Sequence, residues 1–283
     1  MYSGKPGGNV PNYAPLGPPT GAAPPPTPAA RAMPAGKPDA TSVAIVFGTY
    51  NRRALLEQAV YSARRAAGNV NYQMIVIDGG STDGSQDWLR KQEDVVLIEQ
   101  SGPLTGAVKA FNLGFAHAVE RGFPFVAHFN DDAEYRGPKM LQQAVAMMRA
   151  NPQIGAVAYE FDLRGRWDFE SVHGKLYTNF GVIRREAGMA AAVAAGDPTG
   201  KAWWNPIYKT YGADTELGCW LWKLGWIVHG ARGLRVHDSN VHDALRTAND
   251  STKGPHGRHP DSVLFYSRWP TAASLNPTPK PGR

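Results

Sequence analysis

The stretch Phe125-Val-Ala-His-Phe-Asn130-Asp131-Asp132 is an apolar run that ends in two adjacent carboxylates. Buried strands of a parallel sheet read as apolar runs, and ligands of open α/β sheets bind at the carboxyl ends of the strands. A strand that ends in Asp131 and Asp132 therefore places acidic oxygens where a metal ion can reach them. Carboxylate oxygens suit Mg²⁺ or Mn²⁺, which in turn bind diphosphates. An isolated Asp-Asp pair is more often part of a solvated turn. The choice between a turn and a metal site therefore depends on the rest of the sequence.

Strand-like and helix-like segments alternate on both sides of this stretch. Short apolar runs predict strands in four further segments: residues 42–48, 73–78, 95–100 and 154–160. Apolar residues at helical spacing predict four helices: residues 53–67, 85–91, 105–121 and 138–150, the last with Pro138 in its first turn. This alternation predicts an α/β fold, in which a Rossmann-like, mainly parallel sheet carries helices on both faces.

The two ends of the chain differ from this body in composition. Residues 1–40 hold eleven prolines and almost no large apolar side chains, and residues 271–283 are similar in character. Such segments bury too little surface to offset the entropy lost on ordering, so we expect a disordered arm and a disordered tail. Each end carries a net charge of +2, so only +2 of the formal +6 remains for the body. That balance does not define a nucleic-acid surface.

The single cysteine, Cys219, excludes an intramolecular disulfide and fits a reducing compartment. No apolar segment reaches the roughly 20 residues that a membrane span requires. The N-terminus also lacks the charged and apolar regions of a secretory signal. We therefore expect a cytoplasmic protein.

Two other predicted strands end in polar residues. Thr49-Tyr50-Asn51-Arg52 follows the first strand, and Asp78-Gly-Gly-Ser-Thr-Asp83 follows the second. In a doubly wound sheet such strand ends converge on one crevice. An ionised Asp78 can accept hydrogen bonds there from a nucleobase or a ribose. A Gly-rich turn with Asp83 capping the next helix is the structural alternative.

A further acidic cluster and two histidines lie late in the chain. Apolar spacing after Gly212-Ala-Asp214-Thr-Glu216 predicts a helix that starts near Asp214. The helix dipole favours an ionised carboxylate there, which can accept a proton from a hydroxyl nucleophile; a simple helix cap is the alternative. His237 ends another short apolar run, and His242 follows five residues on. Either imidazole can complete a Mn²⁺ site begun by carboxylates, although a single histidine is more often structural.

Taken in order, these motifs resemble the family 2 glycosyltransferases of GT-A fold over residues 42–240. The resemblance rests on six motifs: Thr49-Tyr-Asn-Arg52, Ile77-Asp-Gly-Gly-Ser-Thr-Asp-Gly-Ser85, Asn112-Leu-Gly114, Asn130-Asp-Asp132, Asp214-Thr-Glu-Leu-Gly218 and Val236-His237. It implies one GT-A domain over residues 41–270, with a donor half at 41–160 and an acceptor half at 161–270. It also implies transfer of a sugar, with inversion, from a nucleoside-diphosphate sugar to an acceptor hydroxyl, with Mn²⁺ or Mg²⁺ bridging the diphosphate.

The resemblance also implies roles for single residues. The nucleotide is expected to contact five of them: Thr49, Tyr50, Asn51, Arg52 and Asp78. Asp132 and His237 are the expected metal ligands, with Asp131 beside Asp132 in the donor site. Asp214 matches the catalytic base of inverting members, and Arg184 matches a basic element that commonly precedes the acceptor region.

Four positions depart from the family's usual pattern, and the first, Gly48 where proline is usual, is expected to be harmless. Asn130 replaces the first Asp of the metal signature, Gly79 follows Asp78 where a second Asp is usual, and Ala213 stands where an acid often precedes the base. These last three changes leave less negative charge in the predicted site, and they bear on metal affinity and donor identity more than on the fold.

The acceptor is less defined than the donor. Trp203 and Trp204 lie in a predicted loop, and aromatic faces can stack on sugars or bases. Residues 246–268 carry cationic side chains that suit a phosphate-bearing acceptor, but their interleaved acids equally indicate a solvated mixed surface. A glycan, a lipid-linked phosphate and a modified DNA base all remain open as acceptors. A non-catalytic module that binds a sugar or nucleotide is the other alternative.

Overall fold

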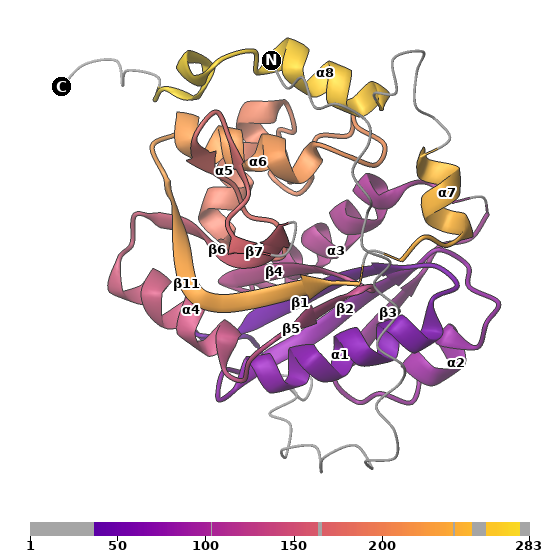
Figure 1. Cartoon of the computed structure of the whole chain (residues 1–283). Coiled ribbons are helices and arrows are strands. Elements are labelled where there is room, and N and C mark those ends of the chain that lie inside the picture. Colours follow the sequence, from indigo (N-terminus) through magenta and orange to yellow (C-terminus); the bar gives the residue numbers. More distant parts are fainter. Residues whose placement is uncertain (1–36, 103, 164–165, 240, 251–258, 278–283) are drawn as a thin grey trace.

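The computed structural model describes residues 37–102, 104–163, 166–239, 241–250 and 259–277, and it forms a central sheet with helices on both faces (Figure 1). The predicted α/β class is confirmed. Most of the expected N-terminal arm lies outside the described residues, as do residues 278–283. None of the described helices is long and apolar enough to cross a membrane.

Four parallel strands form the first part of the sheet. Their order is β3 (Val95–Glu99), β2 (Tyr72–Asp78), β1 (Val43–Thr49) and β4 (Phe125–Asn130). The register pairs Thr49 with Asp78 and Gly48 with Asn130. Three of these strands therefore end at the same level, which places the polar residues after them along one edge of the sheet.

The second half of the chain extends the same sheet. Beyond β4 the order is β10 (Val182–Arg184), β6 (Ile154–Leu163), β11 (Ile227–Asp238) and β5 (Ala133–Tyr135). β10 runs antiparallel to both of its neighbours, whereas β6 and β11 pair in parallel. A short strand, β7 (Arg166–Asp168), pairs with β6, and β8 (Ser171–Val172) forms a separate hairpin with β9 (Lys175–Leu176). The expected strand after β4 is thus present, but β10 lies between the two.

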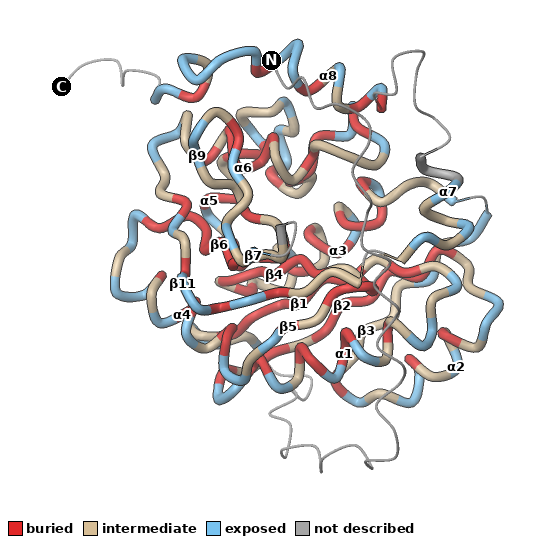
Figure 2. The backbone as a smooth tube through the Cα atoms, in the orientation of Figure 1, coloured by how far each residue is buried: buried red, intermediate tan, exposed pale blue. Residues whose placement is uncertain are grey.

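The helices divide between the two faces, as Figure 1 shows. One face carries α1 (Arg53–Ala67), α2 (Ser85–Leu89) and α4 (Met140–Ala150). The other carries α3 (Ala107–Arg121), α5 (Arg185–Ala195) and α6 (Ala213–Lys223). α8 (Pro260–Arg268) and the 3₁₀ helix η1 (Ala272–Leu275) pack over α6, while α7 (Ala244–Asp250) lies toward the other end of the sheet. Burial follows the strands and the inner helix faces, so each face has its own apolar core (Figure 2).

One glycine explains how closely α3 approaches the sheet. A Cβ at Gly114 would lie 2.2 Å from Val46 Cγ1 and 2.8 Å from Ile77 Cδ1. Only a residue without a side chain permits this distance between the helix and strands β1 and β2. The Asn112-Leu-Gly114 motif therefore has a packing role in addition to any role in ligand binding.

Two expectations about local structure are wrong. Pro138 does not lie in the first turn of a helix, because α4 begins at Met140 after Lys139, whose φ of 59° is left-handed. Residues 271–277 are not part of a disordered tail, because they include η1, whose Leu275 is 1% exposed. The apolar contact of Leu275 with the core around α6 gives this short segment the burial that its composition did not indicate.

Candidate active site

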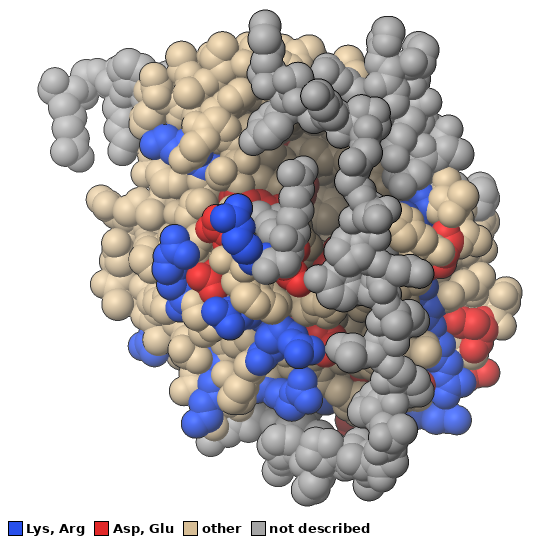
Figure 3. Space-filling model, in the orientation of Figure 1, with Lys and Arg blue, Asp and Glu red and all other residues tan. Residues whose placement is uncertain are grey.

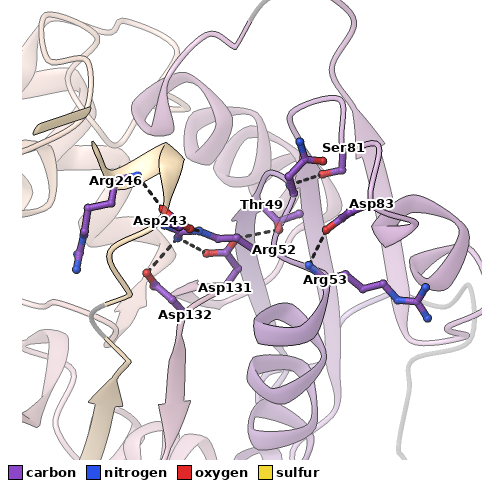
Figure 4. A network of polar contacts seen from close by, with 10 residues as sticks. Thr49, Arg52, Arg53, Ser81, Asp83, Asp131, Asp132, Asp243 and Arg246 are labelled. Atoms are coloured by element: carbon purple, nitrogen blue, oxygen red, sulfur yellow. Dashed lines mark hydrogen bonds and ion pairs between the residues drawn. The ribbon is translucent and has the colours of Figure 1, made fainter. Parts of the chain in front are cut away.

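Asp131 and Asp132 lie directly after β4, at the edge of the sheet where β1 and β2 also end (Figure 4). They are only 4% and 5% exposed. Thr49 Oγ1 donates a hydrogen bond of 2.8 Å to Asp131 Oδ2. Arg52 Nη1 lies 3.0 Å from Asp131 Oδ1 and 3.0 Å from Asp132 Oδ2. These residues thus form a buried acidic pair beside a cation and not a solvated turn.

The electrostatics of this pair favour a positive charge between its oxygens. Burial raises the pKa of Asp131 to about 6; the charge of Arg52 opposes this rise, and that of Asp132 adds to it. Burial alone would lower the pKa of the Arg52 guanidinium, but its bond to Asp243 and the charges of Asp131 and Asp132 raise that pKa above its ordinary value. Mg²⁺ and Mn²⁺ typically take one or two protein carboxylates and complete their shell with water and substrate phosphate. The donor set at the end of β4 therefore fits such a cation.

Asp243 belongs to this network although its sequence context did not indicate it. Its Oδ2 and Oδ1 lie 2.6 Å and 3.0 Å from Arg52 Nε and Nη2. Asp243 Oδ1 also accepts a hydrogen bond of 2.8 Å from Arg246 N at the start of α7. The local sequence signal is only that of a helix N-cap. Nothing in that signal connects residue 243 with residue 52, 191 positions earlier.

The loops after β1 and β2 hold each other in place. Asn51 has a left-handed φ of 51°, and its N–H donates to Ser81 Oγ at 2.8 Å. Asn51 Oδ1 accepts from Thr82 N at 2.7 Å, which leaves its amide NH₂ as the part available to a ligand. Asp83 accepts from Ser85 N, as expected for the start of α2, and also from Arg53 N at the start of α1. One carboxylate therefore fixes both loops relative to β1 and β2.

The two carboxylate oxygens of Asp78 fit its two predicted roles, one in the Gly-rich turn and one in ligand binding. Its Oδ1 accepts hydrogen bonds from Gly80 N, Ser81 N and Gln86 Nε2, at 2.9, 2.8 and 2.7 Å. This oxygen organises the Gly-rich turn. Its Oδ2 is buried and has no hydrogen-bond partner among the described residues. A buried acceptor without a donor is costly, so this oxygen is suited to an N–H or hydroxyl group of a ligand.

Asp214 lies in the first turn of α6, where the sequence predicts a helix start. Backbone hydrogen bonds at Thr215 and at Asp214 itself stabilise its carboxylate, as in a helix cap, so the cap that the sequence left open stays an alternative to the role of a base. Its side chain is half-buried, and Thr215 Oγ1 lies 3.3 Å from its Oδ1. Burial, followed by the charge of Glu170, raises the pKa of Asp214 to about 6. This carboxyl group is therefore ionised at neutral pH and more basic than an ordinary aspartate.

The neighbours of Asp214 come from the hairpin segment, residues 170–179, which the sequence did not single out. Tyr177 N donates to Glu170 O at 3.4 Å, and Asn179 Nδ2 donates to Glu170 Oε2 at 2.7 Å. Trp222 Nε1 of α6 donates to Leu176 O at 2.6 Å. These bonds hold the hairpin segment against α6, so that Glu170 acts on Asp214 electrostatically.

His237 lies on β11, where it pairs with Glu134 of β5. Ser239, two residues after His237, contacts the acidic pair: its N–H donates a hydrogen bond of 2.8 Å to Asp132 O. Even so, the described residues contain no group of three His, Cys, Asp or Glu side chains that could hold a metal ion. His237 as a ligand therefore stays a prediction. His242 is exposed, and its neighbour Asp243 is the residue that enters the network.

Trp203 and Trp204 do not form the exposed acceptor platform that we expected. They are 2% and 6% exposed. Trp203 stacks on Phe115, with ring centroids 5.1 Å apart, and the Trp204 ring lies 4.4 Å from that of Phe111. The expectation is wrong because these large apolar rings pack between α3 and α5 instead of facing solvent.

Arg184 lies on β10, away from the acidic pair. It lies opposite Phe125, at the start of β4, whereas Asp131 and Asp132 follow the other end of that strand. Its guanidinium donates to the carbonyl oxygens of Ile154 and Met148. Arg184 therefore connects β10 with β6 and α4 and does not face the acidic pair, and its assignment to the acceptor region stays a prediction.

Comparison with known proteins bears on the family and the fold of this chain. Residues 44–205 match the family model described as glycosyl transferase family 2. The putative teichuronic acid biosynthesis glycosyltransferase TuaG of Bacillus subtilis (strain 168) is 28% identical over 123 residues, which cover 41% of this chain and 46% of TuaG. The chain thus matches less than half of the length of that relative.

Two solved structures share the fold. The mannosyltransferase PcManGT from Pyrobaculum calidifontis aligns with a TM-score of 0.55 and 18% identity, over 84% of this chain and 75% of its own. TarS residues 1–349 of S. aureus aligns with a TM-score of 0.50 and 14% identity, over 70% of this chain and 60% of its own. The GT-A-type architecture that the sequence predicts is thereby confirmed. With a family model that spans more than half of its length, the chain belongs to glycosyl transferase family 2.

Proposed function

We propose that this chain transfers a sugar, with inversion, from a nucleoside-diphosphate sugar to an acceptor hydroxyl, with the help of a divalent metal ion. The observation that carries the proposal is the presence of two chemically distinct acidic centres. One is the buried pair Asp131 and Asp132 at the end of β4. The other is Asp214 on α6, whose raised pKa suits a general base.

The nucleoside end of the donor is assigned to the loops after β1 and β2. Asp78 Oδ2 is buried and has no partner among the described residues, so it can accept a hydrogen bond from a base or a ribose. The amide NH₂ of Asn51 is a donor on the same side of the site. The Thr49 hydroxyl group donates its hydrogen bond to Asp131, so its role is to orient that carboxylate.

The diphosphate end is assigned to Asp131 and Asp132. These two carboxylates would hold a divalent cation, whose positive charge would stabilise the departing diphosphate. PcManGT, which shares the fold, was solved in complex with GDP-Man and Mn²⁺, and this supports the donor class and the metal. Asp132 and Asp131 provide the carboxylate oxygens, with His237 as a further candidate on β11, the strand that pairs with β5.

The transfer step itself needs one proton acceptor. The acceptor oxygen bonds to the anomeric carbon as the bond from that carbon to the diphosphate oxygen breaks, and Asp214 takes the hydroxyl proton. Attack from the side opposite the leaving group inverts the anomeric centre. A group with a pKa of about 6 is ionised at neutral pH and is basic enough to assist the attack.

Among the described residues, the cations named below give no support to a DNA acceptor. In Figure 3 the Lys and Arg side chains in front of β11 and α4 are interspersed with acidic ones. Arg232 and Arg235 of this region both lie 3.3 Å from Glu160. Arg268, from the cationic segment that we considered for a phosphate-bearing acceptor, pairs with the buried Glu216 at 2.9 Å. A nucleic-acid interface would need unpaired cations along a continuous surface.

A panel of nucleotide sugars tests the proposal. Binding and slow donor hydrolysis are measured for UDP- and GDP-sugars with Mn²⁺, with Mg²⁺ and with a chelator. We expect one nucleotide to bind selectively, with hydrolysis that stops in the chelator. Binding without hydrolysis under every condition would favour a non-catalytic module, and full activity in the chelator would contradict metal dependence.

A further inference from the structure

Arg52 is placed to act on the acidic pair by the turn that follows β1. The left-handed Asn51 reverses the chain, so that Arg52 becomes the residue before α1 and its side chain runs back across the end of the sheet. The Arg52 side chain is only 10% exposed. Figure 4 shows its guanidinium between Asp131 and Asp132 on one side and Asp243 on the other. This cation is thus held inside the site by three carboxylates.

Different N–H groups of the guanidinium bond to different carboxylates. Nη1 is shared by Asp131 Oδ1 and Asp132 Oδ2, both at 3.0 Å. Nε and Nη2 form a bidentate contact with the two carboxylate oxygens of Asp243. A bidentate Arg–carboxylate pair fixes orientation as well as distance, so Asp243 determines where the guanidinium lies.

Asp243 also fastens α7. Its Oδ1 accepts from Arg246 N at 2.8 Å, and its carbonyl oxygen accepts from Thr247 N at 2.9 Å. The hydrogen bond from Ser239 N to Asp132 O fixes the chain just before this point. The same carboxylate therefore holds the first turn of α7 and the cation on the acidic pair.

A divalent cation held by Asp131 Oδ1 and Asp132 Oδ2 would take the oxygen atoms that Nη1 of the guanidinium contacts. A metal–oxygen bond is about 1 Å shorter than these hydrogen bonds, so the two positive groups would be in close contact and repel each other. Both cannot bind the pair in this way at once.

We propose that Asp243 is a positioning residue that holds Arg52 as a built-in counter-ion on Asp131 and Asp132, so that metal loading of this pair displaces Arg52 and loosens α7. The proposal rests on the proposed function, because it takes the acidic pair to be the metal site. By linkage, the coupling has to work in both directions: fastening α7 weakens metal binding, and metal binding releases α7.

Two measurements on the full chain test this without any sugar transfer. Mn²⁺ binding is followed by electron paramagnetic resonance with MnCl₂ as the probe. Amide hydrogen exchange is followed for the first turn of α7, at Arg246 and Thr247, with and without Mn²⁺. We expect Mn²⁺ to increase exchange at these two amides in the wild-type protein severalfold. Exchange that stays the same or falls while Mn²⁺ binds would overturn the proposal.

Variants separate the counter-ion from a purely structural role. Arg52→Gln should bind Mn²⁺ about tenfold more tightly than wild type, and its α7 should exchange rapidly even without Mn²⁺. Asp243→Asn keeps a side chain that can cap α7 but loses the ion pair with Arg52. Exchange at α7 should therefore rise through loss of that pair and not of the cap, and Mn²⁺ should add little. Arg53→Gln is the matched control, since the Arg53 side chain is exposed and pairs with Glu57. Arg53→Gln should behave as wild type.

The outcomes also distinguish this inference from the proposed function. Mn²⁺ that binds wild type and Arg52→Gln equally overturns the inference and leaves the metal site in place. Mn²⁺ that binds neither protein overturns both the inference and the metal part of the proposed function. Nucleotide binding, measured separately with UDP and GDP in a chelator, then shows whether the donor site itself remains.

Discussion

Gly218 of α6 lies directly against Tyr177: a Cβ at position 218 would come within 2.3 Å of Tyr177 Cβ and 3.0 Å of its Cα. Gly218 is one helical turn after Asp214, so the two residues share a face of α6. The absence of a side chain at position 218 thus lets the hairpin segment approach the helix beside the proposed base. This packing sets the environment of Asp214.

Gly218→Ala is therefore expected to push the hairpin segment away from α6. The added methyl group meets backbone and Cβ atoms, which cannot rotate aside, so we expect a loss of about 1–3 kcal/mol in the free energy of unfolding. Chemical denaturation measures this loss. Gly137→Ala is the control, because a Cβ there makes only ordinary contacts, at 3.7 Å from Met140. Equal stability of the two variants would contradict this account of the packing.

Asp214→Asn is expected to remove the base while it preserves the shape of the site. The amide is uncharged and cannot take the hydroxyl proton, so transfer should fall by about 10²–10⁴-fold. Nucleotide affinity should remain close to wild type, because Asp78 and the acidic pair are untouched. Turnover and calorimetric titration with UDP and GDP check the two parts. A variant with near wild-type turnover would disprove the assignment of the base.

The pH dependence of transfer should report the environment of Asp214. Its pKa is about 6 because of burial and the charge of Glu170, and only the ionised form accepts a proton. As the pH falls through 6 the ionised fractions of Asp214 and of Asp131 fall, so kcat/KM should drop at least about tenfold per pH unit below that point. Glu170→Gln removes the neighbouring negative charge and should lower the pKa of Asp214, which moves this limb of the profile to lower pH.

A control variant shows whether the charge of Glu170, or its packing in the hairpin segment, determines the pH at which the rate falls. Asp168→Asn changes an exposed carboxylate close by in sequence that does not act on Asp214. Its pH profile should match wild type. If Glu170→Gln lowers the rate equally at every pH, without moving the limb, Glu170 has a structural role only.

The sequence predicted those site residues that adjoin regular strands and helices. Thr49 and Asp78 are the last residues of β1 and β2, and Asp131 follows β4. The register makes these strands end together, as expected for a parallel sheet. Asp214 was predicted because apolar spacing defines the start of α6. In both cases a local pattern determines the position of the side chain.

The remaining site could not be predicted, because it depends on contacts between distant segments. Asp243 forms hydrogen bonds with Arg52, which lies 191 residues earlier in the chain. Glu170 lies in an irregular hairpin, and its charge acts on Asp214. Trp203 illustrates the opposite error. Its residue type suited a sugar platform, but the sequence does not show that the ring packs on Phe115, nor that Gly188 leaves room for it. Burial of a loop is a tertiary property, and periodicity carries no information about it.

Asp78→Asn tests the donor half of the site separately from the chemistry. An asparagine can keep its carbonyl oxygen as the acceptor for Gly80 N and Ser81 N, so the turn should survive. The position of Oδ2 then becomes an NH₂ group, which donates and cannot accept a hydrogen bond from the nucleotide. We expect nucleotide affinity to fall about tenfold or more, a loss near 1.4 kcal/mol, with little change in melting temperature. Calorimetric titration with UDP and GDP measures the loss, and unchanged affinity would show that the nucleoside does not use this oxygen.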